Sequence, residues 1–258
     1  MRIGLALSGG GALGVAHIGA IEEIEKAGIK IDCVCGVSSG AIIGLAYAAG
    51  GLATLHEFYE ETLANFARKN RFLFAKGPDA AFKYIESALK ELSQGKEFSE
   101  LAIPFASCAT NLATGEREVM NSGDPVAAVM ASSVYPGVFA ARKLEGKFYI
   151  DGGVTRNLPA EETRAMAADF VIGSSIYAVD KFSDQKAGKM NRLEIVARAM
   201  DIYQKELSEF EEKQCDFCFK PNVEQFKWFD FFRMEEIAVQ GRENAAKSIN
   251  GLLAAIKK

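Results

Sequence analysis

Two glycine-rich turns near the N-terminus constrain the fold more than any other feature of the sequence. Residues 2–7 form a short apolar run that ends in the turn at 8–11, and apolar residues then recur at helical spacing over 15–24. The unit is repeated, because the β-prone run 31–34 leads into the small-residue turn 36–40 and then into an apolar, helix-like stretch. This succession predicts strands that lie in a mostly parallel sheet.

The rest of the chain continues the alternation of strands and helices. The predicted elements are a hairpin of residues 103–110 and 116–119, strands at 148–150 and 170–176, and amphipathic helices at 191–213 and 242–256. With 258 residues, 49% of them hydrophobic, the chain can bury a full core, and it shows no internal repeat or linker. We therefore predict one α/β domain over residues 1–258, with helices on both faces of the sheet.

Charge and cysteine content argue against several functions. The formal net charge is −4 and no run of five or six like charges occurs, so we expect no nucleic-acid partner. The five cysteines are typical of reduced thiols in a cytoplasmic protein, and the N-terminus has no pattern that signals export. The cysteine pairs at 33–35 and 215–218 have no histidine near them, so we expect no metal site.

Three segments raise the question of membrane contact. Residues 33–55 carry no charge and are long enough to span a bilayer, but five glycines, two serines and the turn itself favour a buried helix. The basic-then-apolar stretch 68–74 could touch a membrane surface, although a solvated helix end is the commoner explanation. The aromatic side chains at 226–232 would suit the headgroup level, but packing is favoured. We expect no transmembrane span and keep transient contact with a membrane surface as an alternative.

The second turn has the pattern of a catalytic serine. Residues 36–40 read Gly-Val-Ser-Ser-Gly, which fits G-x-S-x-G, and they lie between a predicted strand and a predicted helix as a nucleophile elbow requires. Gly36 and Gly40 lack the Cβ atoms that would collide where strand and helix pack closely. Ser38 is therefore the candidate nucleophile.

The first turn supplies backbone N–H groups without side chains. Residues 9–14 read Gly-Gly-Gly-Ala-Leu-Gly, and we expect Gly9, Gly10 and Gly11 to form an oxyanion hole. The same residues, with Gly14, also fit the G-x-G-x-x-G of dinucleotide-binding proteins. That alternative fails on placement, because its acidic residue should end the second strand whereas Asp32 begins it.

The histidine count points to a different catalytic base. The two histidines of the chain, His17 and His56, do not fit the order serine, acid, histidine, and each is better explained by packing or surface exposure. A carboxylate is the remaining choice. Asp151 is the best placed, because it ends a predicted strand and the following Gly152 and Gly153 let it approach the serine without crowding.

Together, G-G-G-x-x-G at 9–14, G-x-S-x-G at 36–40 and D-G-G at 151–153 resemble the patatin-like phospholipase family. Similarity extends over nearly the whole chain, including the segments 17–20, 131–139, 157–159 and 229–231. The resemblance implies a three-layer α/β/α fold, a Ser38–Asp151 dyad, an oxyanion loop at 9–14, acyl-lipid substrates, and neither metal nor cofactor. One departure is Leu13, which stands where family members often have arginine or lysine.

The expected function is a serine acyl hydrolase that cleaves carboxylic esters of lipids through an acyl-enzyme intermediate. The alternative, from a different class, is a catalytically silent member of the same family that binds lipid or a protein partner. Labelling of Ser38 by a fluorophosphonate separates the two.

Overall fold

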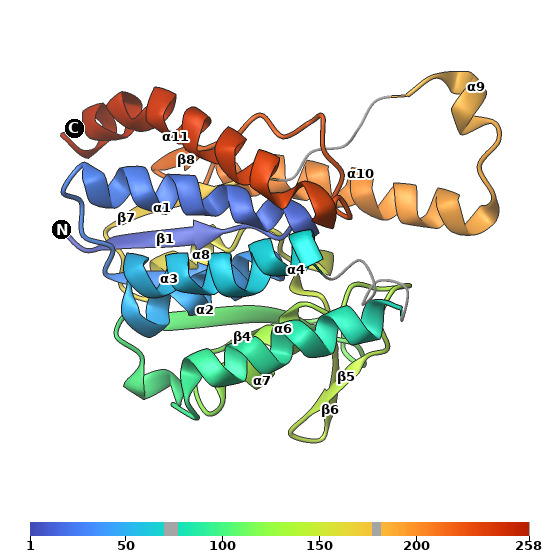
Figure 1. The fold of residues 1–258 in the computed structure, drawn as a ribbon, viewed down its shortest axis with the longest axis horizontal. Helices are drawn as coiled ribbons and strands as arrows, with labels where there is room; N and C mark the ends of the chain where they lie inside the picture. Colours follow the sequence, from blue (N-terminus) through green and yellow to red (C-terminus); the bar gives the residue numbers. More distant parts are fainter. Residues whose placement is uncertain (70–76, 177–181, 258) are drawn as a thin grey trace.

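The central element of the fold is a mixed sheet whose strands run in the order β5-β6-β3-β2-β1-β7-β8, with β4 paired to β3 (Figure 1). The computed structural model describes residues 1–69, 77–176 and 182–257. The strands are β1 (Ile3–Leu7), β2 (Cys33–Gly36), β3 (Phe105–Asn111), β4 (Arg117–Met120), β5 (Arg142–Leu144), β6 (Lys147–Ile150), β7 (Phe170–Ser174) and β8 (Phe217–Phe219).

The strand pairings confirm the mostly parallel sheet that the sequence predicts. Neighbours from β3 through β2, β1 and β7 to β8 are all parallel, and only the pairs made by β4, β5 and β6 are antiparallel. Every residue of β1 is buried, as expected for a strand that helices cover on both faces.

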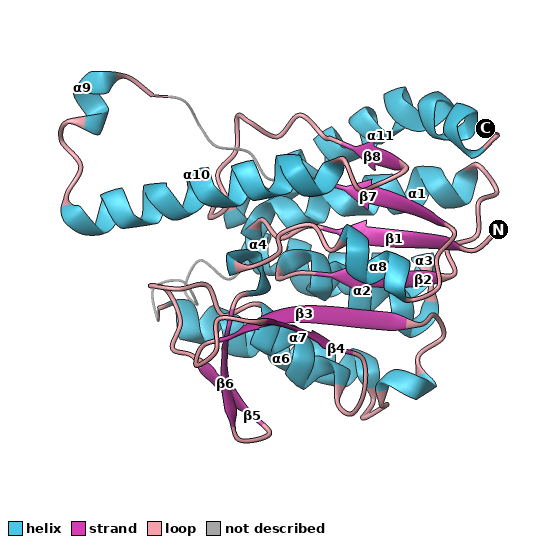
Figure 2. Ribbon diagram, turned by 180° about the vertical axis from the view of Figure 1, so that it is seen from behind, coloured by secondary structure: helices cyan, strands magenta, loops and turns pink. Residues whose placement is uncertain are grey.

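Helices cover the sheet on both sides, so the fold has three layers. The α-helices are α1 (His17–Lys26), α2 (Ser39–Gly50), α3 (Leu52–Phe58), α4 (Asn65–Lys69), α6 (Pro78–Ser93), α7 (Pro125–Ser132), α8 (Ala160–Ala165), α9 (Asp184–Ala187), α10 (Arg192–Glu212) and α11 (Met234–Ile256). The 3₁₀-helices are η1 (Gly11–Ala16), η3 (Phe98–Glu100), η4 (Gly152–Val154) and η5 (Phe231–Arg233), and η2 (Tyr59–Ala64) is a π-helix. Figure 2 shows α8 on the face opposite to α2 and α3.

The alternation of side chains along β1 divides the core between the two faces. Leu5 and Leu7 belong to the larger apolar cluster, which includes side chains of α1, α2 and α11. Ala6 points to the other face, where it packs with Val171 and Ala160. Each face of the sheet is therefore closed by its own helical layer.

Most predicted elements are found, and α11 differs in length. It begins at Met234, eight residues before the predicted start at 242. Gly241 lies within this helix, and a Cβ there would lie 2.5 Å from the carbonyl oxygen of Ala16. The glycine thus permits close packing of α11 against the start of α1 instead of ending a helix.

The uncharged stretch 33–55 forms β2, the following turn, α2 and the start of α3. Most residues of α2 are buried within the layered fold. Within the described ranges, no helix has both the length and the apolar character needed to cross a membrane. Of the basic-then-apolar stretch 68–74, residues 70–74 lie outside those ranges.

Candidate active site

The pairing of β3 explains how Ser38 and Asp151 come together. Ser107 of β3 pairs with both β2 and β4, and Thr110 of the same strand pairs with both β4 and β6. Strand β4 occupies one edge of β3. The other edge is therefore shared by β2 and β6. They run in opposite directions along it, so their carboxyl ends face each other. Ser38 follows the end of β2, and Asp151 follows the end of β6.

Ser38 lies on a strained turn between β2 and α2. Its φ of 51° and ψ of −121° place a non-glycine residue in a region that costs on the order of 1–3 kcal/mol. A Cβ on Gly36 would lie 2.5 Å from the carbonyl oxygen of Gly40, and one on Gly40 would lie 2.5 Å from that of Ser8. The Ser38 N–H donates to the hydroxyl of Ser132 at 2.8 Å. This is the geometry of a nucleophile elbow.

Asp151 is a buried carboxylate, with 2% of its surface exposed. Its Oδ1 accepts the N–H of Gly153 at 2.8 Å, while Oδ2 accepts no hydrogen bond from a described residue. Burial raises the pKa of Asp151 to about 6, although the nearby Ser38 hydroxyl and the Gly153 N–H both lower it. A Cβ on Gly152 would overlap the carbonyl oxygen of Cys108, so only glycine lets this turn approach β3 so closely.

The glycine loop divides into one engaged and two open N–H groups. Gly9 donates to the carbonyl oxygen of Asn157 at 3.1 Å. No hydrogen bond to another described residue engages the N–H groups of Gly10 and Gly11. Gly11 has a φ of 59°, and a Cβ there would overlap the carbonyl oxygen of Trp228. The loop therefore offers Gly10 and Gly11 as donors, while Gly9 holds the loop in place.

Two further motif glycines allow close packing around the site. A Cβ on Gly14 would lie 2.6 Å from that of Ser39, so this glycine brings η1 against the start of α2. A Cβ on Gly153 would lie 2.8 Å from the side-chain nitrogen of Gln204, so this glycine lets the Gln204 side chain of α10 approach the turn closely.

A cavity of about 150 Å³ joins these groups. Ser38, Asp151 and the loop from Gly9 to Gly11 lie along it, and most of the remaining wall is apolar. The apolar part of the wall includes Ile42, Ile43, Leu63, Phe66, Phe82, Ile85, Phe139 and Phe231. Phe82 and Phe139 are in ring contact at 4.5 Å between centroids. The cavity can therefore hold a hydrocarbon chain beside the Ser38 hydroxyl.

Neither histidine lines this cavity. His17 is fully buried, where Nε2 donates to the carbonyl oxygen of Ser8 at 2.9 Å and Nδ1 lies 2.8 Å from the Ser174 hydroxyl. Burial lowers the pKa of His17 to about 4. His56 pairs with Glu22 at 2.7 Å on the surface of α3. Both side chains have the packing or surface roles that the sequence favours.

The aromatic segment 226–232 has a mixed role. Trp228 stacks on Tyr135 at 5.1 Å between centroids, and both line the cavity. Phe226 is buried, whereas Phe229 and Phe232 are 50% and 43% exposed. Packing therefore accounts for part of the segment only.

Several cavity residues had no role in the sequence analysis, and Gln204 is the clearest case. It projects from α10 into the wall beside Gly153. The sequence identifies α10 as amphipathic but does not tell which face meets the site. Leu13, the departure from the family pattern, is buried in the core and lies outside the cavity wall. Asp32 caps the N–H of Ile3 at 2.9 Å, at the opposite end of β1 from the cavity.

A mixed, helix-covered sheet with a strained serine between a parallel strand and a helix defines an α/β protein of the nucleophile-elbow class. The family model for patatin-like phospholipases matches residues 5–164. The chain belongs to the patatin-like phospholipase family.

Relatives with reviewed descriptions agree with this assignment. An uncharacterised NTE family protein of Mycobacterium tuberculosis is 31% identical over 177 residues, which cover 68% of this chain and 49% of that protein. Lysophospholipase NTE1 of Mycosarcoma maydis is 30% identical over 202 residues, covering 73% of this chain and 10% of that protein. The chain thus spans about half the length of the mycobacterial relative and a small part of the fungal one.

Solved structures share the fold at low sequence identity. VipD from Legionella pneumophila superposes with a TM-score of 0.53 and 13% identity, over 97% of this chain and 67% of that one. Human GIVD cytosolic phospholipase A2 gives a TM-score of 0.50 and 12% identity, over 99% of this chain and 59% of that one. These likenesses confirm the three-layer, patatin-like architecture.

Proposed function

We propose that this chain is a serine acyl hydrolase of lipid esters, with Ser38 as nucleophile and Asp151 as its base. The observation that carries the proposal is the pair itself. A strained serine lies beside a buried carboxylate, one oxygen of which accepts no hydrogen bond from the described residues, and both line an apolar cavity. Burial raises the pKa of that carboxylate, which makes it a stronger base than an exposed aspartate and still ionised near neutral pH.

In the proposed acylation step, the Ser38 Oγ bonds to the ester carbonyl carbon while its proton passes to Asp151 Oδ2. The carbonyl π electrons move onto the oxygen, where the N–H groups of Gly10 and Gly11 hold the charge. Collapse of this intermediate breaks the carbon–oxygen ester bond, and the departing alcohol takes the proton from Asp151. Water then gives a proton to Asp151 and attacks the acyl group, and Ser38 recovers the proton as the fatty acid leaves.

The substrate class is an ester with a hydrocarbon acyl chain. The apolar wall of the cavity suits such a chain, and the fungal relative carries the description lysophospholipase. The mechanism uses only side chains and backbone of this chain, without metal or cofactor. We take residues 1–258 as a single unit for this activity.

A chromogenic short-chain ester and a fluorophosphonate test the proposal. S38A and D151N should each reduce turnover by at least about 10³-fold, as loss of a member of a catalytic unit does. S183A, on the exposed segment before α9, is a matched serine control and should retain activity. Labelling should occur at Ser38 in the wild type and disappear in S38A. A folded wild-type protein that is neither labelled nor active would support the lipid-binding alternative instead.

A further inference from the structure

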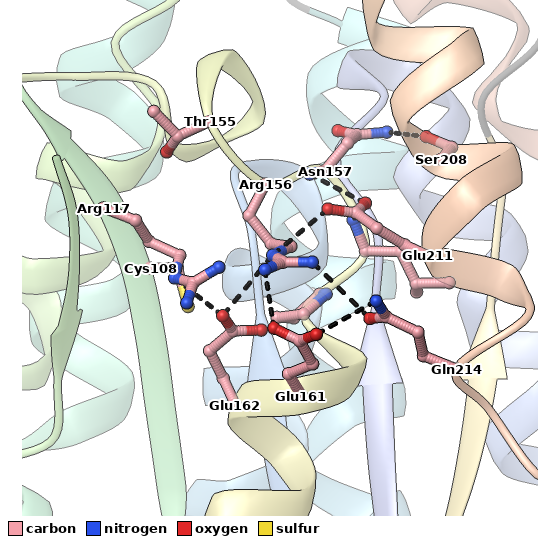
Figure 3. Close-up of polar contacts among 12 residues, drawn as sticks. Cys108, Arg117, Thr155, Arg156, Asn157, Glu161, Glu162, Ser208, Glu211 and Gln214 are labelled. Carbon is pink, nitrogen blue, oxygen red and sulfur yellow. Dashed lines mark hydrogen bonds and ion pairs between the residues drawn. The ribbon is translucent and has the colours of Figure 1, made fainter. Parts of the chain in front are cut away.

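Helix α10 has an unusual distribution of polar and apolar side chains. Its buried positions are Gln204, Ser208 and Glu211, all polar and at most 2% exposed. Its apolar residues include Leu193 and Val196, which are 81% and 61% exposed. A surface helix ordinarily buries its apolar face. The buried polar face of α10 contacts the segment that follows Asp151 (Figure 3). These contacts explain why polar side chains are buried there.

Glu211 makes the central contact of this face. Its Oε2 accepts the backbone N–H groups of Asn157 at 3.1 Å and of Leu158 at 2.6 Å. Its Oε1 lies 3.3 Å from Nε of Arg156. The side chain of Glu211 is fully buried, and burial raises its pKa to about 8 although the N–H groups of Leu158 and Asn157 and the charge of Arg156 lower it. One carboxylate thus restrains three consecutive residues.

Asn157 connects that restraint to the glycine loop. Its carbonyl oxygen accepts the Gly9 N–H at 3.1 Å, and its side-chain nitrogen donates to Ser208 at 2.7 Å. A Cβ on Gly9 would lie 2.8 Å from the Asn157 side-chain oxygen and 3.3 Å from the Ser38 Cβ. Any shift of Asn157 would therefore move Gly9, and with it the open N–H groups of Gly10 and Gly11.

Neighbouring charges support Glu211 without touching the glycine loop. Arg156 also lies 3.5 Å from Glu162, a buried carboxylate that Arg117 approaches at 2.7 Å. On its outer side Arg156 pairs with the half-exposed Glu161 at 2.7 Å (Figure 3). Two buried carboxylates thus lie beside two arginines, which offset part of the cost of burying Glu211.

We propose that Glu211 is a positioning residue for the Ser38 site. By holding the N–H groups of Asn157 and Leu158, it fixes the carbonyl that anchors Gly9 and so aims the N–H groups of Gly10 and Gly11 at the reacting oxygen. This inference rests on the proposed function. Glu211 acts through Asn157 and not by contact with substrate.

The variants E211A and E211Q test the role of Glu211. E211A removes the oxygen that accepts both N–H groups, and E211Q keeps an oxygen that can accept them. We expect E211A to lower kcat and the rate of fluorophosphonate labelling by about 10- to 100-fold with KM within about threefold, because a misplaced group far from the chemistry can cost this much. E211Q should recover a large part of both rates.

Two controls separate positioning from general damage. E161Q removes an Arg156 ion pair without affecting a backbone N–H. D216N removes a carboxylate that accepts the Val171 N–H at 2.7 Å and pairs with Arg164 at 2.8 Å, the same chemistry on another edge of the fold. Both should label and turn over within about twofold of the wild type, and circular dichroism at the assay temperature checks folding of every variant.

Each outcome decides the matter. If the wild type labels at Ser38 and both E211Q and E211A label as fast as each other, Glu211 has no positioning role. The proposed function then stays intact. If E211A fails to fold, E211Q decides alone, and a wild-type KM with reduced kcat supports positioning. A loss in D216N equal to the 10- to 100-fold loss expected for E211A also overturns the proposal. A wild-type protein that does not label at all refutes the proposed function itself.

Discussion

Asp151 faces Ser38 from a fully buried position, and this burial raises the pKa of its carboxyl group to about 6. The two residues are brought together by strands that end opposite each other on one edge of β3. The same burial that makes the carboxylate more basic also makes it costly to ionise. Activity and stability should therefore depend on pH in linked ways.

Activity should fall below about pH 6. A base must be deprotonated to accept the serine proton, so kcat/KM should drop about tenfold per pH unit on the acidic side of that pKa and level off above it. The pH profile of kcat/KM for a neutral ester measures this directly. A profile that is flat from pH 4 to pH 8 would remove Asp151 from the role of base.

D151N should be more stable than the wild type at alkaline pH. The folded-state pKa lies above the ordinary value of 3.8, so the native state keeps a proton that the unfolded chain releases. The wild type therefore loses stability as pH rises from about 4 to about 6 and stays lower above that. The two-unit shift corresponds to about 3 kcal/mol. Denaturant unfolding at pH 4 and pH 8 measures the free energy of unfolding of both proteins. A difference between D151N and the wild type that does not widen with pH contradicts the prediction.

S38G should be more stable than S38A by about 1 kcal/mol, because glycine adopts the φ of 51° without strain. Both variants lack the Ser38 hydroxyl, so only backbone strain distinguishes them. Ser87, exposed within α6, is the matched control. There the order should reverse, with S87G about 1 kcal/mol less stable than S87A. Thermal unfolding of the four variants measures both differences, and the same sign at both positions would refute strain at Ser38.

A larger side chain in the cavity should shorten the preferred acyl chain. Ile85 lines the apolar wall from α6, and tryptophan there would occupy space open to a hydrocarbon chain. Displacing two methylene groups costs about 1.6 kcal/mol, so I85W should lose about tenfold in kcat/KM for long-chain esters. Hydrolysis of an acetate ester should change little. Equal losses for both chain lengths would mean that the acyl chain lies elsewhere.

Local patterns predicted several strands and helices along the chain well. The hairpin of β3 and β4, the strand β7 and the helix α10 were found within a few residues of their predicted ranges. The start of α11 was missed, since Gly241 is read locally as a weak helix former but packs against Ala16. The short strand β5 was also missed, because three residues carry too little periodicity to mark a strand.

By itself, the sequence determined the two strand–turn–helix units and the turn that presents Ser38. Glycine spacing and apolar periodicity act over neighbouring residues, so they can be read without a structure. Only the tertiary structure decided that Gly9 is bonded to Asn157 while Gly10 and Gly11 stay open, and that the buried face of α10 is polar. These features depend on contacts between segments far apart in the chain. Burial of Glu211 beside the residues that follow Asp151 is set by packing, for which no local pattern exists.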